Sequence, residues 1–165
     1  MYSITEKDFS AIVPHKKRKY VLPPNYTKEE RHLLESAPDR TSALGKRDYA
    51  IILLINRLGL RSSDVVNMTF SNLDRVGGKI IFNQYKNDVP HILPLLDIIA
   101  NAIDDYVNNA RPKSDSEFIF LMAYAPYQRL ERTAIHCIFT KYLLAAGIDI
   151  TTRKHGGHAF RASAS

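Results

Sequence analysis

The chain has 165 residues, 45% hydrophobic and 24% charged, and its 23 lysines and arginines against 17 acidic residues give a formal charge of +6. This balance is typical of a globular chain and excludes disorder throughout, while the length predicts one domain. The longest apolar run, 49–55, is far shorter than the ~20 residues that cross a bilayer. The N-terminus has no signal-peptide pattern, and the one cysteine, Cys137, has no partner for an internal disulfide. We therefore expect a basic, cytoplasmic protein with no membrane partner.

Residues 1–25 carry three prolines and too few periodic apolar residues to bury themselves. This composition predicts an extended arm or interdomain linker that precedes a domain over 26–165. The arm contains a run of four cations: Lys16, Lys17, Arg18 and Lys19. Such a run is either a solvated surface segment or a contact for a polyanion, of which DNA is the most plausible.

Three helices are predicted in the first part of the domain. Thr27 and Glu30 form a capping box, which predicts a helix from there to about Ser36. Apolar residues at helical spacing predict a second helix from near Ser42, buried on most sides and ended by Gly59. A short third helix follows, with Ser62 as its N-cap.

The pattern then changes to short extended segments. Residues 72–76 and 79–83 flank Gly77-Gly78, a strong signal for a two-residue hairpin, and 89–93 form a third extended segment. Helical spacing returns over 95–107 and over 129–146, where Cys137 lies within the apolar face and is expected to pack in the core. A last helix begins near 157. We predict a mainly α fold with a small three-stranded antiparallel sheet (α+β).

Polar residues gather in three places that a core does not require. The first follows the second helix, where Arg61 stands beside free backbone donors and suits a phosphate. Asp64 could hold the arginine in place, or the two could pair for structure alone. The second is the strand-joining tip with Lys86, which is either a solvated charge or a mobile general acid or phosphate contact.

The third place is the segment 155–161. His158 and Arg161 are three residues apart and share a face of a helix, and the neighbouring glycines allow close approach to the backbone. His155 and His158 lack a carboxylate or thiol partner, so no metal site is expected. The sequence contains none of the glycine-rich phosphate loops or nucleophile elbows of nucleotide-binding proteins and hydrolases.

Taken together, these three clusters in this order resemble the tyrosine recombinases, the phage integrase family of DNA breaking and rejoining enzymes. The segments that carry the resemblance run over nearly the whole chain from Thr27 onward. They are Gly59-Leu60-Arg61-Ser62-Ser63-Asp64, the lysine hairpin ending in Tyr85-Lys86, and His158-Ala159-Phe160-Arg161. The resemblance implies the catalytic core fold of these enzymes, and a 1–25 linker from a DNA-binding domain.

The resemblance also implies site-specific DNA recombination without a metal or small-molecule cofactor. Arg61 and Arg161 would clamp the scissile phosphate, and Asp64 would support Arg61. His158 would hydrogen-bond the same phosphate or assist proton transfer, and Lys86 would protonate the leaving 5′ oxygen. A tyrosine would attack to form a 3′-phosphotyrosyl link. The implied partners are double-stranded DNA and further recombinase protomers.

One departure from the family pattern concerns the nucleophile. The family places its tyrosine after the His-x-x-Arg box, whereas the last tyrosine here is Tyr142 and only four residues follow Arg161. We expect a catalytic domain that is incomplete at its C-terminus, and a chain that does not cleave DNA. Two alternatives stay open: a non-catalytic DNA-binding remnant that competes with an intact recombinase, and a helical protein whose basic arm binds RNA or an acidic protein.

Overall fold

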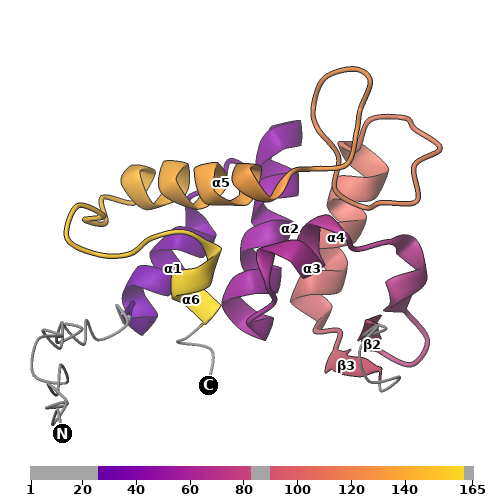
Figure 1. Ribbon diagram of the computed structural model, residues 1–165, viewed down its shortest axis with the longest axis horizontal. Helices are drawn as coiled ribbons and strands as arrows, with labels where there is room; N and C mark the ends of the chain where they lie inside the picture. The colour runs from indigo at the N-terminus through magenta and orange to yellow at the C-terminus, as the bar shows by residue number, and fades with distance from the viewer. Residues whose placement is uncertain (1–25, 83–89, 162–165) are drawn as a thin grey trace, which may run out of the picture.

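The computed structural model describes residues 26–82 and 90–161, and Arg161 only in its backbone. Six α-helices, a 3-10 helix and three strands follow one another along these residues (Figure 1). They are α1 (Lys28–Ser36), α2 (Ala43–Leu58), α3 (Ser62–Val66), η2 (Phe70–Asn72), β1 (Leu73–Asp74), β2 (Lys79–Phe82), β3 (His91–Pro94), α4 (Asp97–Asn109), α5 (Arg132–Ala145) and α6 (Gly157–Arg161). The predicted α+β class is confirmed. None of the helices in the described residues is long and apolar enough to span a membrane.

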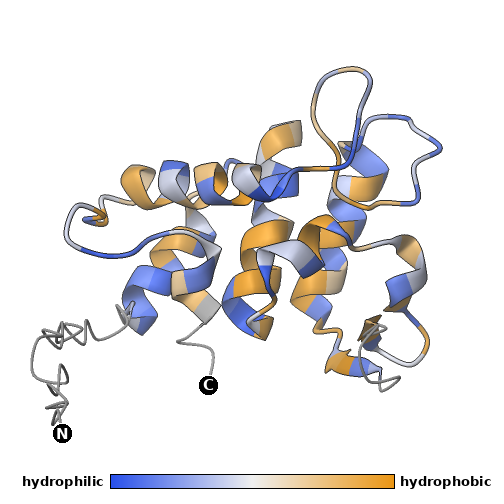
Figure 2. Ribbon diagram, viewed as in Figure 1, coloured by the Kyte–Doolittle hydropathy of each residue, from blue (hydrophilic) through white to orange (hydrophobic). Residues whose placement is uncertain are grey.

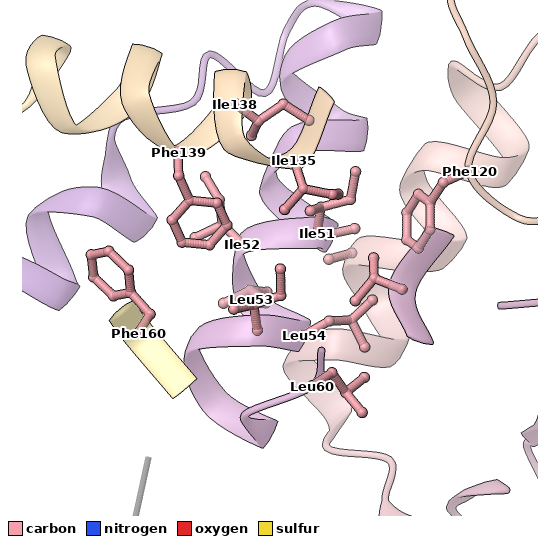
Figure 3. Packing of buried hydrophobic residues seen from close by; sticks show 14 of the residues in the cluster. Ile51, Ile52, Leu53, Leu54, Leu60, Phe120, Ile135, Ile138, Phe139 and Phe160 are labelled. Atoms are coloured by element: carbon pink, nitrogen blue, oxygen red, sulfur yellow. The ribbon is translucent and has the colours of Figure 1, made fainter. Parts of the chain in front are cut away.

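Helix α2 forms the centre of the fold. All six residues of the run 50–55 are fully buried, so the helix needs neighbours on every side. α1, α3, α4, α5 and α6 all contact it. Figure 3 shows Ile135 and Phe139 of α5 and Phe160 of α6 packed around its apolar side chains, and Figure 2 shows hydrophobic residues along much of its length.

A buried polar cluster ties the first half of α2 to α5. The guanidinium of Arg47 donates to Asp48 Oδ1 at 2.8 and 3.0 Å and to the backbone oxygen of Leu121 at 3.1 Å. The hydroxyl of Tyr142 donates to Asp48 Oδ2 at 3.1 Å. Burial, together with the negative charge of Asp48, raises the pKa of Tyr142 well above its usual value.

A second polar cluster ties the last turns of α2 to α1. Asn56 is 2% exposed, and its side-chain amide donates to Glu35 Oε1 at 2.5 Å while its Oδ1 accepts from Arg31 Nε at 2.7 Å. Arg57 donates to both oxygens of the buried Glu35, at 2.8 and 2.6 Å. These bonds fix the end of α2 immediately before Gly59.

The sheet has the order β1-β2-β3, antiparallel throughout, and lies at the opposite end of the molecule from α6 (Figure 1). The predicted two-residue hairpin is wrong, because Asp74 pairs with Lys79 and leaves four residues, 75–78, in the turn. Asp74 Oδ1 accepts the Gly77 N–H at 2.8 Å, and Gly78 takes a left-handed φ of 60°. The side chain of Asp74 therefore organises a longer turn than the glycine pair alone suggests.

Three further predictions need correction. Arg61, with extended backbone, is the N-cap of α3, and Ser62 is its first helical residue. α5 begins at Arg132 rather than at 129, because Leu130 N–H bonds to the Phe120 oxygen in an extended pairing. Cys137 is exposed, so it does not pack in the core.

The buried hydroxyl of Tyr142 leads to a prediction about pH. Because the native pKa is raised, the unfolded chain loses this proton first, and native stability falls as pH rises above about 10. We expect Tyr142→Phe to lower the free energy of unfolding at pH 8 by about 1–3 kcal/mol, because Asp48 loses a donor. The same variant should show a shallower decline between pH 9 and 11 in urea unfolding. Tyr124→Phe, at an exposed side chain, is the control, and equal declines in both variants would contradict the assignment.

Candidate functional site

The turn after α2 presents Arg61 to solvent. Gly59 ends the helix with a left-handed φ of 63°, and its N–H bonds to the Ile55 oxygen at 3.0 Å. Leu60 is buried and anchors the turn, whereas Arg61 is exposed. The chain thus holds the backbone of Arg61 between a buried side chain and the start of α3 while its guanidinium stays accessible.

Asp64 contacts the backbone of Arg61. Its Oδ2 accepts the Arg61 N–H at 3.3 Å, and its Oδ1 accepts from the Ser63 hydroxyl at 3.4 Å. Of the ion pairs found in residues 26–82 and 90–160, none joins the Arg61 guanidinium to Asp64. The carboxylate therefore shapes the turn and leaves the guanidinium available for a ligand.

Close packing brings the turn that bears Arg61 together with α6. A methyl group added at Gly157 would lie 3.0 Å from Ser62 Oγ, 3.2 Å from Ile55 Cδ1 and 3.5 Å from Ile135 Cγ2. The start of α6 therefore packs tightly on α2 and α3, and a larger residue at 157 would require the side chains of Ser62 and Ile55 to shift by a few tenths of an ångström. Figure 1 shows α6 beneath α5 and beside α2. The first and third polar clusters of the sequence are therefore neighbours in the fold.

The predicted site residues divide into two groups. Arg61, Asp64 and His158 are described, and His158 is exposed while the next two residues, Ala159 and Phe160, are buried. Arg161 is the last residue of α6, but its side chain lies outside the described structure, as do Lys86 and the basic run of the arm. The structure therefore brings together two of the three predicted clusters.

A pair of histidine rings joins α5 to the loop before α6. His155 is 4.9 Å from His136 of α5 between ring centroids, and Gly156 lies so close to His136 that an added methyl group would be 2.7 Å from its Nδ1. Across the described part of the chain, no group of three or more His, Cys, Asp or Glu side chains is placed to hold a metal ion. Sequence reasoning missed His136, because nothing near it on α5 indicates a contact with residues so much later in the chain.

The comparison that decides the family covers most of the chain. A sequence profile described as the phage integrase family matches residues 25–165. The chain belongs to this family. Its members are the tyrosine recombinases, an enzyme class, and the order of the Arg61 turn, the sheet and the His-x-x-Arg helix agrees with the expectation from sequence.

Curated relatives in this family include several bacterial recombinases. The integrase/recombinase y4rA of Sinorhizobium fredii is 38% identical over 131 residues, which are 78% of this chain and 31% of that protein. The tyrosine recombinase XerD of Staphylococcus haemolyticus is 27% identical over 154 residues, which are 90% of this chain and 51% of that protein. The chain thus spans between about a third and a half of these two proteins.

Solved structures of tyrosine recombinases share the fold. The XerA recombinase superposes with a TM-score of 0.70 at 20% identity, over 90% of this chain and 50% of that one. The XerH recombinase bound to its palindromic difH substrate gives 0.71 at 17% identity, over 87% and 41%. The catalytic core of lambda integrase gives 0.61 at 16% identity, over 85% and 80%. The fold is that of a tyrosine recombinase catalytic domain.

Two glycines with positive φ allow a test of the contact between α5 and the loop before α6. Gly147 (φ 70°) has no neighbour within 4 Å of an added methyl group, whereas Gly156 (φ 100°) faces His136. We expect Gly147→Ala to lower the free energy of unfolding by about 1–2 kcal/mol through backbone strain alone. Gly156→Ala should cost more and should also speed hydrogen exchange at the α6 amides, which Gly147→Ala leaves unchanged. Equal exchange in both variants would show that the contact with His136 does not hold α6.

Proposed function

We propose that this chain carries the phosphate-binding part of a catalytic domain for site-specific DNA recombination. The observation that supports the proposal is the close approach of Gly157 to Ser62, because Ser62 directly follows Arg61 and Gly157 directly precedes His158. Two arginines and a histidine are side chains that suit a phosphate oxyanion, because they supply charge and hydrogen-bond donors. Membership in the phage integrase family supports the same function.

The roles follow from the chemistry of a phosphodiester. Arg61 and Arg161 bind the non-bridging oxygens and offset their charge in the transition state, and His158 donates a further hydrogen bond. Asp64 holds the backbone of Arg61. A tyrosine Oη attacks phosphorus, the bond to the 5′ oxygen breaks, and Lys86 gives that oxygen a proton. The 3′-phosphotyrosyl bond keeps the energy needed for rejoining, so no cofactor is required.

The arm and the partners are part of the proposal. Residues 1–25 form a linker whose basic run, 16–19, follows the phosphates of double-stranded DNA, and 26–165 belong to the catalytic domain. One solved relative, the XerH recombinase, is bound to its difH substrate, and another is a lambda integrase dimer bound to a COC′ core site. By analogy, we propose duplex DNA and further recombinase protomers as partners. We also propose that the protein acts in the cytoplasm and that a mobile genetic element encodes it.

A second function is favoured by the positions of the tyrosines. The nine tyrosines of the sequence all precede the His-x-x-Arg box, so none stands where the family places its nucleophile. As a second candidate, we propose that these 165 residues bind DNA phosphates without cutting them and compete with an intact recombinase for its site.

Binding to duplex DNA provides the first test of the phosphate clamp. We expect Arg61→Ala to weaken binding to a 30-base-pair duplex about 10–100-fold, because a charge-assisted hydrogen bond is worth about 1.5–3 kcal/mol. The slope of log affinity against log salt should fall by about 0.9. The control, Lys113→Ala, removes the same charge at an exposed position on the loop after α4. Equal losses in the two variants by fluorescence anisotropy would reduce Arg61 to a contribution to net charge.

A nicked duplex distinguishes binding from chemistry. The chain should bind such a substrate but form no covalent adduct on a denaturing gel, because no tyrosine occupies the family position of the nucleophile. Tyr142 cannot substitute for it, since its hydroxyl is held by the buried Asp48. An adduct would instead assign the attack to one of the nine tyrosines present, and peptide mapping would identify which.

A further inference from the structure

The residue that precedes α1 is packed against α6. Tyr26 is 4% exposed, and its ring stacks on that of Phe160 with 4.1 Å between centroids and 17° between planes. In a capping box, the residue at this position commonly packs on its own helix, but Tyr26 packs on a helix from the other end of the chain. Its hydroxyl also donates to the backbone oxygen of Lys154 at 3.2 Å, in the loop that leads into α6.

The same loop is held a second time by Glu30. Arg153 Nη1 donates to both carboxylate oxygens of Glu30, at 2.8 and 2.9 Å, and its guanidinium lies 5.4 Å above the ring of Tyr26. Glu30 is also the capping-box residue of α1, and it accepts the Thr27 N–H at 2.9 Å. One carboxylate therefore both starts α1 and holds the loop before α6.

The described part of helix α6, Gly157–Arg161, is held in place by its packing against other elements. Phe160 is fully buried between Tyr26 and Phe139, whose rings lie 4.1 and 5.2 Å away. Phe160 stands between His158 and Arg161 in the sequence. A shift of the Phe160 backbone would therefore move its neighbours in α6 as well.

We propose that Tyr26 and Glu30 are positioning residues of the phosphate site: they clamp Phe160 and Arg153, and so hold α6 in register with the turn that bears Arg61. The role rests on the proposed function. It makes the geometry of the site depend on the segment by which the chain enters the domain. A displacement of Tyr26 relaxes α6, and His158 and Arg161 then lose their alignment on the phosphate that Arg61 binds.

Three variants separate the parts of this clamp. Tyr26→Ala removes the stacked ring and the bond to Lys154, and Tyr26→Phe keeps the ring. Glu30→Gln retains a side chain that can cap α1 but loses the charge that faces Arg153. Ile103→Val in α4 is the control, since it trims a fully buried side chain on a helix outside the clamp.

The readouts are the ring signals of His158 by NMR and the affinity for the 30-base-pair duplex, with urea unfolding to measure stability. We expect Tyr26→Ala to shift the His158 signals and to weaken DNA binding at least fivefold. Tyr26→Phe should restore most of both, and Glu30→Gln should shift the His158 signals by a smaller amount. Ile103→Val should lose stability with unchanged His158 signals and unchanged affinity. If Tyr26→Ala does not fold, the comparison of Glu30→Gln with Ile103→Val decides the matter.

Unchanged His158 signals in both Tyr26→Ala and Glu30→Gln would overturn the positioning role, whatever the DNA affinity. Equal shifts in Ile103→Val would also overturn it, because they would show a general effect of lost stability. A third outcome would overturn the proposed function: the His158 signals shift, but neither Arg61→Ala nor Tyr26→Ala changes the affinity for DNA. The link between the clamp and phosphate binding would then fall as well.

Discussion

The burial of α2 on every side is the constraint on which the rest of the structure depends. A helix whose residues 50–55 are all fully buried cannot lie at a surface, so other helices must cover each of its faces. Five of them do, and α6 is one. Because α6 fills the last part of this cover, its His-x-x-Arg sequence lies against the end of α2, where Arg61 emerges. The requirement to bury apolar surface thus brings α6 close to the turn that bears Arg61.

Buried polar groups decide how α2 sits within that cover. Hydrophobic packing alone tolerates small shifts, whereas a buried charge without partners is costly. Asp48 is met by Arg47 and Tyr142 near one end of α2, and Asn56 by Arg31 and Glu35 near the other. Because both ends of α2 are restrained, the positions of Gly59 and of the Arg61 backbone, which follow the helix, are fixed as well.

Much of this fold could be predicted from local patterns. The capping box at Thr27, the buried run of α2 and the stop at Gly59 are signals that short stretches carry by themselves. The length of the turn at 75–78 was missed because the side chain of Asp74 bonds to the backbone there. The exposure of Cys137 was missed because apolar neighbours in the sequence do not determine which way a side chain faces. The joining of the first and third clusters was expected only from resemblance. The contacts of Tyr26 and His136 left no local trace, since their partners lie more than a dozen residues away.

The shared role of Glu30 has a consequence for the order of folding. The contacts of Tyr26 and Glu30 with 153–160 join the two ends of the described chain, with up to 128 residues between partners. Contacts of such long range carry the largest loop-closure cost and form late. During synthesis, α1 to α5 can therefore pack before α6 leaves the ribosome. The contacts that join α1 to the loop before α6 and to Phe160 then form after those among α1 to α5, so the two ends of the described chain come together only once the central helices have packed.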